Sequence, residues 1–566
     1  MRLLLIVVVL IFCYPVFSQK DISGILKNEL EREMKVLSDQ DISAYYISYR
    51  VHDEKYLSIS GQLGSITDCS STKNRRIGVE VRVGDYHRDN THKVDNLYSA
   101  GLFSSNSTAL LPIDNDSLAL EQGIWEATQS AYISAKQSYE EKQDELKENT
   151  ELKESKLDNF SKVEPEEYFE DNIEIDVDKT IKEWSEKIKY YSGIYASDSL
   201  LITSDVFLNF MDQRKYFVSN EGSCLCTNML MVSLGFDFNY VDKEGDIVSY
   251  SKVFYAHKPD ELPDKEEIEK ELKRIYSMLK KISVAPYADP YAGPAILSAS
   301  AAGVFFHEIF GHRVEGHRLN DESDSHTFKN KLGKQILPKT ISVTADPTLK
   351  LINGVPLMGT YAYDDQGVKS QKVELVKDGI LNDFLMSRSP VESIYKSNGH
   401  GRGDLGLEPV ARQSNLIITS NKQLDDKKLR KKLIQECKKQ KKEYGYYFKE
   451  VVGGFTQTTR FQPDVFNIYP IEVYRVYVDG RPDELVRGIN FIGTPLAIFD
   501  GILAAGDDYD VFNGICGAES GNIPVSAAAP SLLIKKIETQ KTFKLDFKMP
   551  VIERPYNKKN SEEAEK

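Results

Sequence analysis

The segment His307-Glu-Ile-Phe-Gly-His312 contains the groups that metal-assisted hydrolysis requires. Two neutral imidazoles can hold a zinc ion, an open coordination position can take a water, and a neighbouring carboxylate can accept a proton from that water. We therefore expect His307 and His312 to bind zinc and Glu308 to act as the general base on the zinc-bound water. Two other histidine pairs share this spacing, but only His307 is followed by glutamate.

The spacing of the two histidines sets a geometric requirement. They are five residues apart, whereas the familiar zincin motif places them four apart on one helix face. On a regular helix, side chains five residues apart point roughly 140° away from each other. A π-bulge, or a helix that loosens at Gly311, would bring both rings to one ion. The sequence therefore predicts a distorted helix, which the small apolar stretch 295–306 would begin.

A third ligand is needed, because two histidines rarely suffice for tight zinc binding. Cys516 is a candidate, since the glycines in Asn513-Gly-Ile-Cys-Gly let the backbone come close to another element. The alternative is an ordinary buried thiol, because cysteine is among the most buried residue types. Glu315, His317 and His326 compete with Cys516 as zinc ligands or as partners of the ligands.

The chain is long enough to form more than one hydrophobic core, and the elements of these cores position the candidate groups. At 566 residues it exceeds the size at which a single core stops growing. Composition changes near residues 286–295, which are rich in small residues and proline. We predict an α+β fold, with an N-terminal α/β domain over 19–290 and a C-terminal, largely β domain over 291–553 that carries the metal-site helix. A charged helical insertion is expected at about 121–189.

Periodicity predicts the main elements of both domains. Helices are expected at 19–40 and 264–281. Strands are expected in the N-terminal domain at 44–51, 56–59, 77–83, 216–230 and 231–255, with a turn at 242–246. In the C-terminal domain they are expected at 340–344, 372–376, 416–419, 465–478 and 531–538.

The first residues indicate export. A short positive start precedes an apolar run the size of a signal-peptide core, which is shorter than a membrane span. We predict a leader over residues 1–18 with cleavage before Gln19, and a periplasmic or secreted mature protein. No later stretch is long and apolar enough to predict a membrane span. The polar tail 554–566 is predicted to be disordered.

Charge and cysteine content narrow the possible partners. The net charge of −14 argues against a nucleic-acid partner, because affinity for nucleic acid is built from clustered Lys and Arg, although local basic patches remain possible.

Five cysteines follow the leader, and an odd number in an oxidising compartment leaves one thiol for another task, such as binding metal. We expect the remaining cysteines to be buried rather than bridged: Cys69, Cys224, Cys226 and Cys437.

Several blocks of the sequence resemble the TldD/PmbA family of zinc-dependent peptidases. The strongest are Phe306-His-Glu-Ile-Phe-Gly-His-Arg-Val-Glu-Gly, Tyr363-Asp-Asp-Gln-Gly-Val and Asn513-Gly-Ile-Cys-Gly. Shorter matches are Gly399-His-Gly-Arg-Gly, Arg412-Gln-Ser-Asn-Leu and Val451-Val-Gly-Gly. The resemblance is dense from about residue 295 to 538 and thinner before it. The leader and the charged insertion depart from many relatives.

The resemblance implies a set of roles for this chain. It implies that His307, His312 and Cys516 bind zinc and that Glu308 is the general base. Because the chain keeps HExxxH, it resembles the catalytic type, and our working hypothesis is hydrolysis of peptide bonds in small or unfolded peptides. The family also implies a dimer, either of identical chains or with a paralogous subunit that lacks HExxxH. The alternative function is an inactive zinc-containing scaffold or partner subunit that binds peptides.

Overall fold

The computed structural model describes residues 22–91, 106–148, 157–321, 323–324, 326–392, 394–459, 466–493, 498–542 and 552. The predicted leader and the predicted disordered tail lie outside these residues, so both stay predictions. The fold is a mixture of helices and strands with a largely β C-terminal region, which confirms the predicted α+β class. Among the described helices, none is long and apolar enough to cross a membrane.

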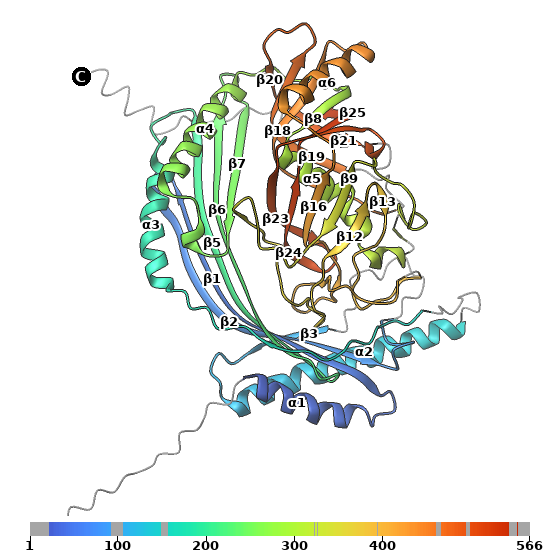
Figure 1. Cartoon of the computed structure of the whole chain (residues 1–566). Helices are drawn as coiled ribbons and strands as arrows, with labels where there is room; N and C mark the ends of the chain where they lie inside the picture. The colour runs from blue at the N-terminus through green and yellow to red at the C-terminus, as the bar shows by residue number, and fades with distance from the viewer. Residues whose placement is uncertain are drawn as a thin grey trace, which may run out of the picture.

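The N-terminal region is built on one seven-stranded sheet, drawn as a tall curved wall in Figure 1. Its strands run in the order β3-β2-β1-β5-β6, and β4 and β7 both pair with β6. They are β1 (Ala44–Gln62), β2 (Ser65–Val83), β3 (Asn106–Leu111), β4 (Glu167–Phe169), β5 (Leu201–Ser219), β6 (Cys224–Val241) and β7 (Ile247–Ala256). The two short strands predicted at 44–51 and 56–59 are therefore parts of one long strand, β1.

Helices pack against both ends of this sheet. Figure 1 shows α1 (Ile22–Leu37) and α2 (Ser117–Glu148) at one end, and α3 (Val177–Gly193) and α4 (Lys265–Ser283) at the other, with the short η1 (Pro259–Glu261) before α4. The predicted charged stretch is helical in α2 and α3, but the described residues between them, 157–176, contain no helix and include the short strand β4. Helix α2 is also not exposed on all sides. Its residues Leu120, Ile124 and Ala127 lie four and three positions apart and are buried in the core beneath the sheet.

The C-terminal half contains two larger sheets with one helix between them. The eight-stranded sheet has the order β17-β22-β25-β21-β19-β18-β8, with β20 on β19 and β8 also paired to β25. The six-stranded sheet has the order β13-β12-β9-β16-β24-β23. Helix α5 (Ala299–Ile309) contacts β18 of the first sheet and β23 and β24 of the second, while α6 (Asp426–Lys439) packs against β8 and β18 of the first.

The strand bounds of this half are as follows. The eight-stranded sheet comprises β8 (Ala292–Leu297), β17 (Gln423–Leu424), β18 (Tyr444–Thr456), β19 (Phe466–Tyr477), β20 (Glu484–Val486), β21 (Ile489–Gly493), β22 (Ile502–Gly506) and β25 (Leu532–Lys541). The six-stranded sheet comprises β9 (Ile341–Ala345), β12 (Val373–Lys377), β13 (Ile380–Leu381), β16 (Asn415–Ser420), β23 (Asp510–Ala518) and β24 (Gly521–Ala529). Two small hairpins pair β10 (Leu351–Ile352) with β11 (Val355–Pro356) and β14 (Gly401–Arg402) with β15 (Val410–Ala411).

Helix α5 fits between the sheets because its residues are small or apolar. Ser298 caps its N-terminus by accepting a hydrogen bond from the Ala301 N–H. Gly303 faces β24 so closely that a Cβ there would lie 2.7 Å from the Ala527 carbonyl oxygen. Nearly every residue of the helix is buried, including His307 at its end. The sequence thus places the first histidine at the centre of the C-terminal core.

The predicted cysteine environments are only partly correct. Cys224, Cys226 and Cys437 are buried, as expected. Cys69 is exposed, because it lies in the half of β2 that has no neighbouring strand on its outer side among the described residues. The prediction of a buried Cys69 is therefore wrong.

Candidate metal centre

The helix that carries His307 ends before it reaches His312. Helix α5 stops at Ile309, and the chain continues through Phe310 into the 3₁₀ turn η2 (Gly311–Val314), which is followed by η3 (Gly316–Leu319). Of the two predicted distortions, the structure has the loosened helix and not the π-bulge. A Cβ at Gly311 would lie 1.8 Å from the Gln413 carboxamide oxygen, so a side chain there would displace Gln413 from its hydrogen bond to the His307 carbonyl oxygen.

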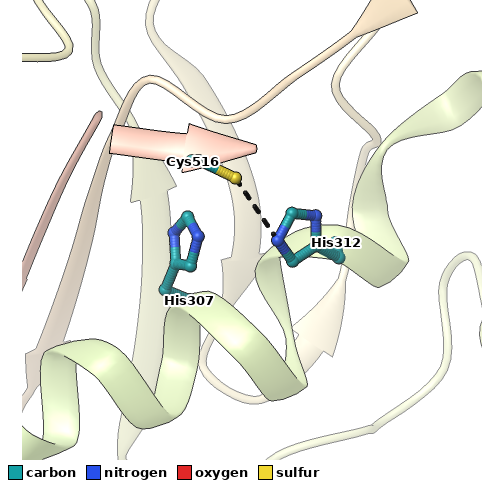
Figure 2. A group of neighbouring side chains, drawn as sticks. All are labelled: His307, His312 and Cys516. Carbon is teal, nitrogen blue, oxygen red and sulfur yellow. Dashed lines mark hydrogen bonds between the residues drawn. The ribbon is translucent and has the colours of Figure 1, made fainter. Parts of the chain in front are cut away.

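This change of pitch brings His307, His312 and Cys516 together (Figure 2). Their ligand atoms all lie within 4.8 Å of one another, and all three residues are buried. The His312 Nε2 atom is 3.5 Å from the Cys516 Sγ atom. Cys516 comes from β23, on the opposite side of the group from α5 and η2. Two elements about two hundred residues apart in the chain therefore converge on one point.

The three residues fit a zinc ion in both chemistry and spacing. Imidazole and thiolate are typical zinc ligands, and a set of three protein ligands leaves a fourth position open, as in catalytic sites. Bonds of about 2.0–2.1 Å to nitrogen and about 2.3 Å to sulfur, at a tetrahedral angle, separate the two ligand atoms by about 3.6 Å. The distance of 3.5 Å between Nε2 and Sγ agrees with this value.

Glu315 lies behind His312 rather than beside the other ligand atoms. Its Oε2 is 3.1 Å from the His312 Nδ1 atom. If Nδ1 carries the proton it donates to this carboxylate, and Nε2 keeps a lone pair directed towards Cys516. The geometry therefore makes Glu315 a partner of a ligand.

The other two competing residues lie outside the main group. His317 belongs to a second group with Glu315 and Glu519. Arg318 contacts both of these carboxylates, at 2.9 Å and 3.0 Å, and so supplies a positive charge there. His326 belongs to neither group of described ligand atoms.

Opposite charges stabilise the ionised forms of these buried groups. Although burial opposes the charged imidazolium, Glu315 and Cys516 raise the pKa of His312 well above its usual value. Burial also opposes the thiolate, yet His312 and His307 lower the pKa of Cys516 well below its usual value. In the same way, His312 and Arg318 overcome burial and lower the pKa of Glu315 to about 2. Without a metal, these contacts therefore favour a Cys516 thiolate beside a charged His312, and zinc binding would release the proton from His312 Nε2.

The backbone of Glu308 is held by a hydrogen bond, whereas its carboxylate forms none within the described structure. Arg313 Nη1 donates to the carbonyl oxygens of Glu308 and Ile309 at 2.9 Å and 3.0 Å, and so caps the end of α5. The Glu308 side chain packs so closely on β18 that a Cβ on Gly454 would lie 2.6 Å from its Cγ. Within the described part of the chain, the carboxylate makes no hydrogen bond or ion pair, so it is available to a water or a substrate group.

Three residues that support this group were not predicted from the sequence. Arg412 Nη2 donates to the carbonyl oxygen of Cys516 at 2.8 Å, and Gln413 Nε2 donates to that of His307 at 3.2 Å. Gly454 allows Glu308 to approach β18. The signal was present, because these residues lie in two of the short blocks that carry the family resemblance. Their contacts could not be read from spacing.

Replacing Glu315 with Gln is expected to weaken zinc binding by about 10–100-fold, the usual cost of losing a partner of a metal ligand. Glutamine keeps the size of the side chain but removes the negative charge that orients and polarises His312. Competition against a chromophoric chelator would measure the change. Glu374→Gln is a matched control, because Glu374 is exposed and contacts the surface residues Lys377 and Asn382 rather than the metal group. Equal zinc affinity in both variants would exclude Glu315 from the metal centre.

Comparison with known families identifies a match in the C-terminal half. The model of a family described as the PmbA/TldA metallopeptidase C-terminal domain matches residues 291–541. This range begins just before β8 and ends with β25, so it includes α5, η2 and β23. All three residues of the candidate metal group therefore lie inside the matched region.

Curated relatives show the same similarity. A metalloprotease of Methanothermobacter thermautotrophicus is 25% identical over 349 residues, which are 60% of this chain and 70% of that protein. A zinc metalloprotease TldD homolog of Saccharolobus solfataricus is 26% identical over 270 residues, covering 47% of this chain and 54% of that protein. A metalloprotease TldD homolog of Haemophilus influenzae is 28% identical over 251 residues, which cover 43% of this chain and 47% of that protein. The chain thus spans about half the length of the last two relatives.

Solved structures share the fold over most of the chain. TldE from Thermococcus kodakarensis superposes with a TM-score of 0.61 at 12% identity, covering 91% of this chain and 99% of that one. A protein from Thermotoga maritima, described as a proposed modulator of a DNA gyrase, gives a TM-score of 0.59 at 14% identity. The superposition covers 91% of this chain and 100% of that one. At such low identity these similarities establish the fold alone.

Proposed function

We propose that this chain, which belongs through residues 291–541 to the PmbA/TldD metallopeptidase family, is a zinc-dependent peptidase acting on small or unfolded peptides. One observation carries the proposal. His307, His312 and Cys516 reach one buried point from a helix end, a 3₁₀ turn and a distant strand, with a separation of Nε2 and Sγ that suits zinc. Glu308, the expected base, is adjacent to His307 in the chain.

Each residue of the site would have a separate role in peptide hydrolysis. A zinc ion held by the three ligands would supply a Lewis acid that polarises the scissile carbonyl and lowers the pKa of water. The Glu308 carboxylate would accept a proton from the attacking water and return it to the leaving amine. Glu315 would hold the His312 ring in its orientation, and Arg313 would fix the Glu308 backbone. Burial of the group excludes bulk water from these charges.

The first test removes the metal from the purified full chain. We expect about one zinc per chain and hydrolysis of a diverse peptide pool that a chelator abolishes and added zinc restores. Zinc at about 1,000 times its Kd would stabilise the fold by about 4 kcal/mol, which thermal unfolding with and without chelator would detect. Mass spectrometry of the digested pool reports cleavage. A zinc-replete chain that cleaves nothing would contradict the peptidase proposal and favour the inactive scaffold.

A further inference from the structure

The guanidinium of Arg412 lies fully buried behind the metal group. Its Nη2 donates to Cys516 twice, to the carbonyl oxygen at 2.8 Å and to Sγ at 3.3 Å. Its Nη1 donates to Ser520 Oγ at 2.7 Å and to the Gly521 carbonyl oxygen at 3.1 Å. Its Nε lies 3.7 Å from the Glu315 carboxylate. Because a guanidinium is a rigid planar fork, these contacts fix the strand that carries Cys516 together with the turn that follows it.

The strand β23 needs such support, because it is the edge strand of its sheet and pairs only with β24 among the described strands. Asp404 holds the turn between these two strands. Its N–H donates to the Ser520 carbonyl oxygen, and its carboxylate accepts from the Asn522 N–H, each at 2.8 Å. The turn lies a few residues beyond Cys516, so a fixed turn limits where the thiol can move.

The loop that contains Asp404 is held from its other side by the N-terminal sheet. Arg50 of β1 is buried and donates to the carbonyl oxygens of Gly403 and Leu407 at 3.1 Å and 2.7 Å. Leu405 packs over Gly78 of β2, where a Cβ would lie 3.0 Å from its Cδ1. The contacts therefore run without a break from the N-terminal sheet, through the loop 403–407 and the turn 519–520, to the strand that carries Cys516.

We infer that Arg412 and Arg50 are positioning residues for the metal centre, and that the N-terminal sheet holds the Cys516 strand in the place where zinc binds. The inference rests on the proposed zinc site and goes beyond it. It gives the N-terminal region a part in metal retention, although all three ligands come from the C-terminal half. Neither arginine is assigned contact with substrate or with reacting atoms.

The test is a double-mutant cycle on the full chain, read as zinc affinity. Arg412→Met should weaken zinc binding about 10–100-fold, as expected for loss of a partner of a ligand. Arg50→Met acts at a distance and should weaken it about 3–10-fold. The double variant should lose little more than Arg412→Met alone, because both act through the same turn. Cobalt substitution gives a second readout, since the thiolate-to-cobalt absorption band should shift in both single variants.

Arg274→Met is the matched control. Arg274 lies on α4 and also reaches the C-terminal half, through Glu472 on β19, and its other hydrogen bonds go to Glu271 and Tyr250 rather than to the loop 403–407. It should lower the unfolding temperature and leave zinc affinity unchanged. Should Arg412→Met fail to fold, Asp404→Ala removes the exposed carboxylate that accepts from the Asn522 N–H, which loosens the same turn and should weaken zinc binding.

The outcomes separate this inference from the proposed function. Wild-type zinc affinity in folded Arg412→Met and Arg50→Met variants would overturn the inference alone. An equal loss of affinity in Arg274→Met would also overturn it, because any domain contact would then suffice. A wild-type chain that holds no zinc would refute the zinc site itself. Failure to cleave peptides would leave the inference standing, since affinity is measured without substrate.

Discussion

Glu308→Gln is expected to keep its zinc and lose about 10²–10⁴-fold in kcat, the range that general acid–base catalysis contributes. Glutamine has nearly the same shape as glutamate, so it can occupy the same space against Gly454. It cannot accept a proton from water at neutral pH. Because the Glu308 carboxylate has no protein partner in the described structure, the substitution should not disturb the fold. Metal analysis and initial rates on one peptide would be measured on the same preparation.

The matched control for this variant is Glu374→Gln, which changes the charge of the chain by the same amount at an exposed position on β12. It should keep both zinc and activity. A Glu308→Gln chain that cleaves peptides at the wild-type rate would remove Glu308 from the mechanism. A Glu308→Gln chain that has lost its zinc would show instead that this carboxylate supports the metal, and would assign it a different role.

Much of the C-terminal fold could be predicted because its strands have clear patterns. The strands predicted at 340–344, 416–419 and 531–538 correspond to β9, β16 and β25 within a few residues. Helix α6 was not predicted, because its buried positions Leu429 and Leu433 are set among many lysines and arginines. A short apolar stripe inside a basic segment carries little signal, although packing against β8 and β18 stabilises the helix.

The candidate site could be predicted from the sequence only as far as its ligands. The five-residue spacing requires a distorted helix, and Gly311 indicates where the distortion falls. Nothing in the local pattern shows that β23 comes to lie across from α5, because that depends on the order of strands in the six-stranded sheet. The contacts of Arg412 depend on the same long-range pairing. The resemblance to a known family, rather than spacing, connected Cys516 to the two histidines.

The second large effect is expected at Cys516. Cys516→Ala leaves two imidazoles, which rarely hold zinc tightly, so zinc affinity should fall well beyond the 10–100-fold typical of an outer partner. Peptidase activity should be lost with the metal. The unfolding temperature should equal that of the chelator-treated wild type and should no longer rise when zinc is added. Metal analysis and thermal unfolding across a zinc titration would measure both effects.

Cys437→Ala is the matched control, because Cys437 is a buried thiol on α6 and belongs to neither group of clustered ligand atoms. It should lose some packing but keep one zinc and full activity. A second group of described residues that could hold a metal ion is formed by Glu315, His317 and Glu519. If Cys516→Ala still bound one zinc at wild-type affinity, the metal would have to lie in another group such as this one. Cys516 would then be an ordinary buried thiol, and the roles proposed for Arg412 and Arg50 would fail with it.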